Sequence, residues 1–297
     1  MSTVKVLLLL ALLACATRAC ATEWELAWSD EFDKDGSPDA TKWDFEKGFV
    51  RNQELQYYTS RRKENARVEN GTLVIEARRE RWPNASYRRG SRDWRMSRRL
   101  AEYTSAALTT KGKATWTYGR IEVRAKLPRG RGVWPAIWML GTNIDRKGWP
   151  ACGEIDIMEY VGFDPAHVHG TVHTRKYNHM RDTQKGARTA VEKPWERFHV
   201  YVVAWERDRI DFFVDGRKYF TFRNEGTGAD AWPFDGEHFL ILNLAVGGSW
   251  GAQKGVDAKV FPQKFTVDYV RVYRRKTGDK VQGQGPESRR ADTQVRP

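Results

Sequence analysis

The sequence of 297 residues is poor in cysteine, has no long apolar run and contains no internal repeat. It has three cysteines, and only Cys152 remains if the chain is cleaved after Ala21, so no disulfide is expected within the mature chain. No helical periodicity persists for more than a few residues. These absences exclude a disulfide-bonded scaffold and a helical bundle.

The first residues have the features of a secretory signal. Lys5 precedes the apolar run Val6–Ala14, which is too short to span a membrane. Ala19–Ala21 fits an A-x-A cleavage site, which predicts a signal peptide over residues 1–21 and a secreted protein, which we expect to be monomeric. In the alternative, "LLAC" resembles a bacterial lipobox and would give a cell-surface or periplasmic lipoprotein anchored at Cys15.

Short runs rich in β-branched and aromatic residues recur along the chain, with turn residues between them. Many of these runs alternate apolar and polar side chains, which is the pattern of half-buried strands. Asp215 and Gly216 lie between two such runs and predict a hairpin. The pattern indicates an all-β fold with strands at sandwich spacing in one domain over residues 22–275. A polar, glycine-rich tail follows over residues 276–297 and is expected to be disordered and basic.

The formal charge of +13 is unevenly distributed. The segment Arg78–Arg99 contains nine arginines against two acids, and the tail adds a further basic excess. A solvated loop and tail explain this charge most simply, and an acidic substrate or an anionic cell surface is the alternative. No nucleic-acid-binding module accompanies the charge, so nucleic acid is not expected as a partner.

Three carboxylates lie within the segment "GEIDIMEYVG", at Glu154, Asp156 and Glu159. In a strand, side chains alternate between two faces, so Glu154 and Asp156 share one face and the isoleucines between them enter the core. Strict alternation would bury Glu159 as an unpaired charge, which is costly. One additional residue near Met158, a β-bulge, would return Glu159 to the face of the other acids. The uneven spacing therefore predicts a bulged strand with three acids on one exposed face.

Such a row of acids is open to three interpretations. Two carboxyl groups about 5–5.5 Å apart are the nucleophile and the acid/base of a retaining glycosidase, and their crowding separates their pKa values. Three acids could also bind a hard cation such as calcium, or form a solvated acidic face. Trp134, Trp138 and Trp250 favour catalysis on a sugar, because an indole offers a flat apolar surface to a sugar ring.

Cysteine and histidine chemistry is less well supported by the pattern. Cys152 lies two residues before Glu154 but lacks the flanking residues of a thiol protease, which predicts a buried, unreactive thiol. His167, His169 and His173 have strand spacing that could suit zinc, and this is the alternative for them.

The segment "GEIDIMEYVG" resembles the signature of glycoside hydrolase family sixteen, in its laminarinase (endo-β-1,3-glucanase) branch. The resemblance continues in order over about residues 24–275, through "WSDEF", "RNQELQYYT", "YGRIEVRAKLPRGRGVWPAIWMLG", "VHGTVHT" and "LILNLAVGGSWGA". It implies a β-jelly-roll sandwich of two curved antiparallel sheets with a concave substrate cleft. It also implies retaining endo-hydrolysis of laminarin-like β-1,3-glucan or of mixed-linkage β-1,3-1,4-glucan, with no cofactor for catalysis.

The resemblance also implies a role for each matched residue. Glu154 takes the place of the nucleophile, Asp156 of its hydrogen-bonding helper and Glu159 of the acid/base. The positions matched to sugar-binding residues are Asn52, Trp134, Trp138, His173 and Trp250. Some relatives bind a structural calcium, for which the matching side chain is Asp268, near Glu31.

Two features depart from the family pattern. Ala107 stands where many relatives have an arginine that contacts sugar, which would weaken one subsite or change the linkage preference. The arginine-rich segment Arg78–Arg99 is not part of the core pattern.

Two other functions remain as alternatives. One is hydrolysis of an anionic galactan, and the other is β-glucan binding without catalysis. Relatives that only bind glucan have lost the acids, whereas this chain retains all three.

Overall fold

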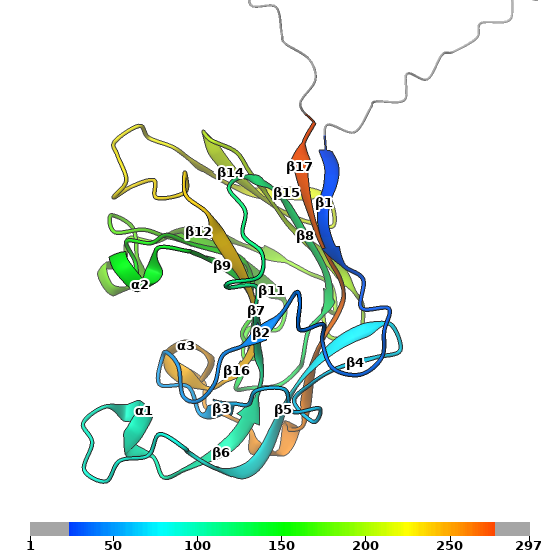
Figure 1. Ribbon diagram of the computed structural model, residues 1–297, viewed down its shortest axis with the longest axis vertical. Helices are drawn as coiled ribbons and strands as arrows, with labels where there is room; N and C mark the ends of the chain where they lie inside the picture. Colours follow the sequence, from blue (N-terminus) through cyan, green and yellow to red (C-terminus); the bar gives the residue numbers. More distant parts are fainter. Residues whose placement is uncertain (1–23, 277–297) are drawn as a thin grey trace, which may run out of the picture.

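Strands with one apolar face build two large sheets that pack against each other (Figure 1). The computed structural model describes residues 24–276. Its strand β8 (Gly119–Lys126) buries Ile121, Val123 and Ala125 in the core and leaves the residues between them partly exposed. This alternation recurs in several strands, and the two sheets form the predicted all-β jelly roll.

The larger sheet has ten strands, and its main path runs β15-β14-β13-β8-β17-β5-β6-β3, with β1 paired to β17 and β4 paired to β5. All of these pairs are antiparallel except β3 with β6. Besides β8, its strands are β1 (Trp24–Asp30), β3 (Gln56–Tyr58), β4 (Ala66–Glu69), β5 (Thr72–Pro83), β6 (Leu100–Ser105), β13 (His199–Trp205), β14 (Arg209–Val214), β15 (Arg217–Arg223) and β17 (Gln263–Arg275).

The smaller sheet has seven antiparallel strands in the order β12-β11-β10-β9-β16-β7-β2. They are β2 (Asp44–Phe45), β7 (Ala107–Thr109), β9 (Val133–Gly141), β10 (Glu154–Glu159), β11 (His167–His173), β12 (Lys185–Ala190) and β16 (His238–Val246). The short helices are α1 (Trp94–Ser97), α2 (Ile144–Lys147), α3 (Gly248–Gly251), η1 (His179–Arg181) and η2 (Ala258–Val260).

The main core lies between the two sheets. From β9 it receives Val133, Ile137 and Met139, which alternate with side chains on the other face of the same strand. On that other face, Trp138 packs in a smaller cluster with Phe239. The smaller sheet therefore has a second face, away from the core, that is free to bind a ligand.

The predicted hairpin joins β14 to β15 through Asp215 and Gly216, whose φ angles are 49° and 78°. Two consecutive positive φ angles are the geometry for which an Asp-Gly pair is preferred. Within residues 24–276, no helix has the length and apolar character needed to cross a bilayer. The predicted signal peptide, Cys15 and the tail from residue 277 onward lie outside the described residues.

Candidate active site

The strand β10 carries the three acids and contains the predicted bulge. Against β9, Asp156 lies opposite Trp138 and Met158 lies opposite Ile137, so Ile157 is the additional residue. The register against β11 shifts in the same interval. The extra residue therefore separates the first two acids from the third, as the uneven spacing predicted.

The bulge divides the side chains of β10 between core and cleft. Ile157 and Met158 enter the main core as consecutive residues, whereas Glu154 and Glu159 are partly exposed and line one cleft. Asp156 also lines this cleft but is only 2% exposed. The three acids thus share a face, but the middle acid is not exposed as expected, because its shorter side chain keeps the carboxyl group close to the sheet.

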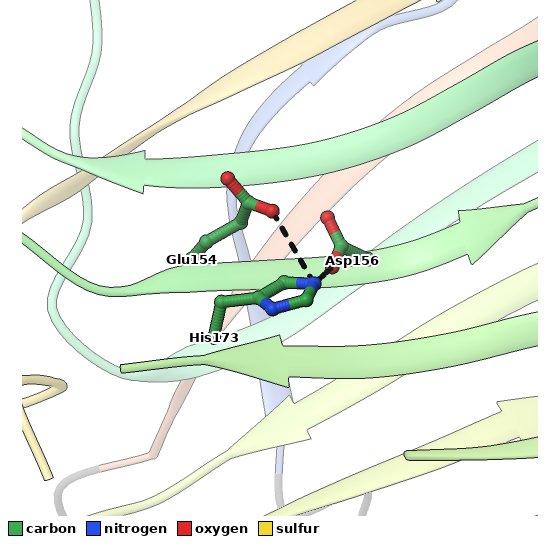
Figure 2. Close-up of side chains that lie close together, drawn as sticks. All are labelled: Glu154, Asp156 and His173. Atoms are coloured by element: carbon green, nitrogen blue, oxygen red, sulfur yellow. Dashed lines mark ion pairs between the residues drawn. The ribbon is translucent and has the colours of Figure 1, made fainter. Parts of the chain in front are cut away.

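His173 lies beside the first two acids, from the neighbouring strand. It is opposite Glu154 in the register of β10 and β11. Its Nε2 atom is 3.3 Å from Oδ2 of Asp156 and 3.7 Å from Oε1 of Glu154 (Figure 2). These three side chains could offer ligand atoms within 4.8 Å of one another to a metal ion. A negative charge on Glu154 can therefore interact with both Asp156 and His173.

Two indoles hydrogen-bond the outer acids. Nε1 of Trp149 donates to Oε2 of Glu154 at 2.9 Å, and Nε1 of Trp134 donates to Oε1 of Glu159 at 3.0 Å. Each acid therefore has one oriented oxygen, and each hydrogen bond favours the ionised form. Trp134 was predicted as a sugar contact, and the structure gives it this second interaction.

Burial and mutual repulsion raise the pKa values of all three acids. Burial is the main cause for each, and it raises the pKa to about 8 for Glu154, Asp156 and Glu159. The charge of Asp156 raises the pKa of both glutamates further, whereas the indole hydrogen bonds and His173 oppose the rise. At neutral pH the cluster therefore holds protons that ordinary carboxyl groups would have lost, as an acid catalyst requires.

The predicted sugar-binding residues line two pockets that meet at the acids. One, of about 590 Å³, is lined by Asn52, Trp134 and Trp138 together with the three acids. The other, of about 440 Å³, is lined by His173 and Trp250 and shares Asn52, Trp134, Glu154 and Glu159 with the first. A chain passing from one pocket to the other would cross the acids, which is the geometry of a cleft that cuts within a polymer.

The floor of the larger pocket contains polar residues that the sequence did not single out. Trp138 donates from Nε1 to Oδ1 of Asn243 at 2.7 Å, which fixes the plane of its ring. The guanidinium of Arg51 lies 4.8 Å from the centre of the Trp138 ring and pairs with Glu46. Nη1 of Arg51 is buried and has no hydrogen-bond partner among residues 24–276. Only the position of Arg51 beside Asn52 in the sequence could have indicated this residue.

The other candidate chemistries are not assembled within residues 24–276. Cys152 is buried, and burial raises the pKa of its thiol to about 12, so it is unreactive as predicted. His167 pairs with Asp164, and the ring of His169 packs against Trp250. The three histidines of β11 therefore do not gather around one point, and the zinc alternative has no support.

The carboxylates named for calcium each have an arginine partner. The carboxylate of Asp268 accepts a hydrogen bond from Arg124, and that of Glu31 accepts hydrogen bonds from Nε and Nη2 of Arg271. A calcium ion needs six to eight oxygen ligands, and here guanidinium groups take the carboxylates. Nothing among the described residues supports the calcium site, which stays a prediction.

Ala107 lies in β7, fully buried and opposite Asn243 of β16. Its carbonyl oxygen accepts the backbone N–H of Glu46 at 3.0 Å. The side chain of Glu46 is in turn the ion-pair partner of Arg51, which lines the larger pocket.

Comparisons with known proteins agree with this geometry. The family model for glycosyl hydrolases family 16 matches residues 53–271. A β-glucanase of Rhodothermus marinus is 52% identical over 266 residues, which are 86% of each chain. A glucan endo-1,3-β-glucosidase A1 of Niallia circulans is 36% identical over 84% of this chain, which matches 38% of that longer protein.

Solved structures are similar over most of the fold. The X-ray structure of the laminarinase from Rhodothermus marinus has a TM-score of 0.76 and 52% identity, covering 84% of this chain and 97% of that one. The endo-β-1,3-glucanase from Pyrococcus furiosus has a TM-score of 0.75 and 40% identity, covering 86% of this chain and 96% of that one. The chain belongs to the glycosyl hydrolases of family 16.

Proposed function

We propose that this chain is a retaining endo-β-glucanase that cleaves β-1,3-glucan of the laminarin type or mixed-linkage β-1,3-1,4-glucan. The observation that carries the proposal is the bulge of β10, which brings Glu154 and Glu159 into one cleft, each with an indole N–H on its carboxyl group. The relatives support the substrate class, since they include a β-glucanase and endo-1,3-β-glucosidases.

In the first step, a carboxylate oxygen of Glu154 attacks the anomeric carbon and forms a glycosyl ester. Glu159 gives its proton to the glycosidic oxygen, and the bond from that oxygen to the anomeric carbon breaks. In the second step, Glu159 takes a proton from water, and the water oxygen replaces Glu154 at the anomeric carbon. Two displacements at one carbon retain its configuration.

Asp156 has the role of a positioning residue in this mechanism. It is the least exposed of the three acids, and burial is the main cause of its raised pKa. When protonated, it can donate a hydrogen bond to Glu154 and so favour the ionised nucleophile. Nε2 of His173, from the neighbouring strand β11, lies 3.3 Å from Oδ2 of Asp156.

The two pockets would bind sugar units on either side of the cleaved bond. Trp138 lines one pocket and Trp250 the other, while Asn52 and the two glutamates line both. The alternative of glucan binding without catalysis is not favoured, because the acids are present with raised pKa values. Hydrolysis of an anionic galactan is not favoured by the relatives of highest identity.

The amino-terminal pattern supports an extracellular place of action, where the protein would meet its polymer. Fractionation of the producing cells tests this placement, with protein released into the medium as the expected result. Recovery in the membrane fraction would favour the lipid anchor at Cys15, and recovery in the cytoplasm would contradict both.

A reducing-sugar assay tests the proposed function on laminarin, lichenan and agarose. The wild type should release ends from the first two, and the first product should be the β-anomer by NMR. Glu154→Gln should lose at least about 10⁴-fold in kcat, since removal of a nucleophile costs other hydrolases on the order of 10⁶-fold. Glu237→Gln is the matched control, because Glu237 is exposed and outside both pockets. A wild type inactive on every glucan, or full activity in Glu154→Gln, would contradict the proposal.

A further inference from the structure

The arginine-rich segment Arg78–Arg99 extends from the larger sheet through the end of β5, α1 and the turn into β6 (Figure 1). It contains nine arginines and no lysine. Seven of these arginines are exposed, at positions 79, 81, 88, 89, 92, 95 and 99. In α1, Trp94 packs against Phe49, whereas Arg95 is exposed.

Most of this charge is uncompensated. Within the segment, ion pairs are found for Arg78 with Glu76 and for Arg95 with Asp93. The other exposed arginines form no ion pair with any residue that the structure describes. Like charges held close together repel, and each arginine without an ion pair adds to this repulsion, which destabilises the folded state. The fold therefore keeps a concentrated positive surface without neutralising it.

The segment is nonetheless held in a defined conformation. Nδ2 of Asn84 donates to the carbonyl oxygens of Arg95 and Arg98 at 2.8 and 2.9 Å, which closes the loop around α1. Asp93 caps α1 by accepting the N–H of Arg95. A positively charged surface that is already ordered loses less entropy when it binds.

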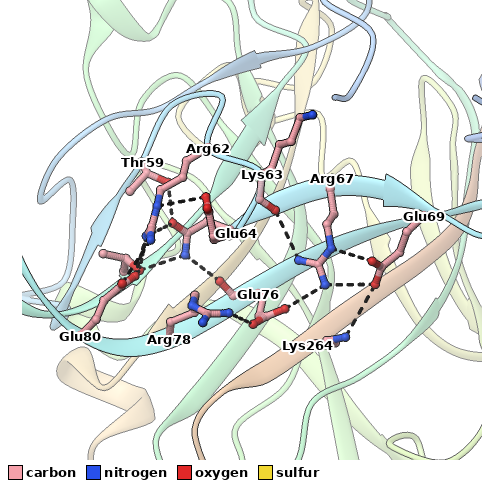
Figure 3. Close-up of polar contacts among 12 residues, drawn as sticks. Thr59, Arg62, Lys63, Glu64, Arg67, Glu69, Glu76, Arg78, Glu80 and Lys264 are labelled. Atoms are coloured by element: carbon pink, nitrogen blue, oxygen red, sulfur yellow. Dashed lines mark hydrogen bonds and ion pairs between the residues drawn. The ribbon is translucent and has the colours of Figure 1, made fainter. Parts of the chain in front are cut away.

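The base of the segment is fixed by a network of charged residues (Figure 3). Arg62 donates to both carboxylate oxygens of Glu80 in β5, and Glu80 also accepts from Thr104 of β6. The guanidinium of Arg62 lies 4.6 Å from the centre of the Trp82 ring. These contacts tie the two strands that leave the sheet, so the segment is anchored on both sides.

The segment is continuous with the cleft. Nε of Arg95 donates to the carbonyl oxygen of Val50 at 2.9 Å, and both residues line the larger pocket. Nη1 of Arg98 donates to the carbonyl oxygen of Glu54 at 3.0 Å. The residues that border the sugar-binding floor are therefore held by the arginines of the segment.

We propose that the arginine-rich segment binds polysaccharide chains that carry carboxylate or sulfate groups, as an extension of the cleft. The guanidinium group is planar and donates two parallel hydrogen bonds to such groups, which suits arginine rather than lysine. A polysaccharide is favoured over nucleic acid because the surface runs into the cleft that the proposed function assigns to sugars. The inference rests on that assignment and adds a second ligand chemistry to it.

The test compares binding of two probes of equal length, a β-1,3-glucan and the same glucan carrying carboxymethyl groups. All proteins carry Glu154→Gln, so that the probes stay intact during calorimetry at about 0.01 M and about 0.15 M salt. The segment variant is R88S/R89S/R92S, which leaves Arg95 and the cleft unchanged. The matched control is R207S/R217S/R223S, which removes the same charge at exposed positions around β14 and β15. Thermal unfolding checks that each variant is folded.

The chain with an intact segment should bind the carboxymethylated probe about tenfold more tightly at low salt, since several exposed ion pairs each contribute modestly. This preference should shrink as salt rises, disappear in R88S/R89S/R92S and persist in the control. Equal binding of both probes by the intact segment would overturn the inference. A loss of preference as large in the control would assign the effect to net charge alone and would overturn the inference. Duplex DNA is the third probe, and tighter binding of DNA than of the carboxymethylated glucan through the segment would also overturn it. Absence of binding to the neutral glucan would instead count against the proposed function.

Discussion

Trp149 donates its indole N–H to Oε2 of Glu154 across 2.9 Å, from the loop that precedes β10. The opposite oxygen, Oε1, is the one that lies nearer to His173. The two oxygens of the proposed nucleophile are thus distinguished by their neighbours, and the indole holds the carboxylate in one orientation. A hydrogen bond to the ionised form lowers the pKa and opposes the effect of burial.

Replacement of this donor should shift the pH profile. In Trp149→Phe the ring remains but the N–H is lost, so the pKa of Glu154 rises further. Because the nucleophile must be ionised, the acidic limb of kcat/KM should move to higher pH, with a loss of about tenfold at pH 6, as expected for one hydrogen bond to a charged group. Trp195→Phe is the control, since Trp195 lies outside both pockets. An unchanged acidic limb would show that the indole does not tune Glu154.

Azide should distinguish the two glutamates by the product formed. In Glu159→Ala, a substrate with a good leaving group still forms the glycosyl ester, and azide then enters from the face of the missing acid. The expected product is the β-glycosyl azide, which keeps the starting configuration. In Glu154→Ala, azide replaces the nucleophile and gives the α-glycosyl azide. The opposite pairing, determined by NMR, would reverse the assignment.

The acid cluster should lower stability at neutral pH. Burial raises the folded pKa of Asp156 from 3.8 to about 8, so between these values the folded chain binds more protons than the unfolded chain. The free energy of unfolding must then fall as pH rises through this window. Asp156→Asn does not titrate and should be more stable than wild type at pH 8, by about 1–2 kcal/mol, although less active.

Denaturant unfolding at several pH values measures this difference. The curve of the free energy of unfolding against pH should be flatter for Asp156→Asn than for wild type. Glu237→Gln provides the control, because it removes an exposed acid. If the wild type gained stability between pH 5 and pH 8 relative to Asp156→Asn, the raised pKa would be contradicted.

The pair of Arg51 and Glu46 should contribute to substrate binding rather than to chemistry. Both side chains are replaced in Glu46→Gln/Arg51→Gln, so that neither is left as an unpaired charge beside Trp138. KM for glucan oligosaccharides should rise about five- to tenfold, with kcat within about twofold, because this contact is made before and during the reaction. The control is Asp44→Asn/Arg61→Gln, an exposed ion pair outside the pockets. A loss in kcat without a change in KM would instead show that the pair stabilises the transition state.

The sequence was sufficient for features that depend on nearby residues. The bulge in β10 followed from the spacing of three acids, since a buried unpaired glutamate would be costly. The hairpin at Asp215 and Gly216 followed from turn chemistry. The burial of Asp156 did not follow, because it depends on how far a side chain reaches above the sheet.

Contacts between distant segments could not be predicted from spacing. Trp138 is fixed by Asn243, which is 105 residues away, and Trp149 contacts Glu154 from a loop without periodicity. His173 was identified through the family resemblance, and its position opposite Glu154 depends on the pairing of two strands. The contacts of these side chains can be predicted only when the order and register of the strands are known.

The additional residue Ile157 makes the direction of the Glu159 side chain depend on the bulge. Two residues lie between Asp156 and Glu159, so in a regular strand Glu159 would face the core, and the bulge returns it to the cleft. Deletion of Ile157 would remove the bulge and leave the acid two positions after Asp156, which is still on the cleft face of a straight strand. The acid/base therefore keeps its direction when the extra residue and the bulge are lost together, whereas straightening the strand with both Ile157 and Met158 retained would turn Glu159 into the core.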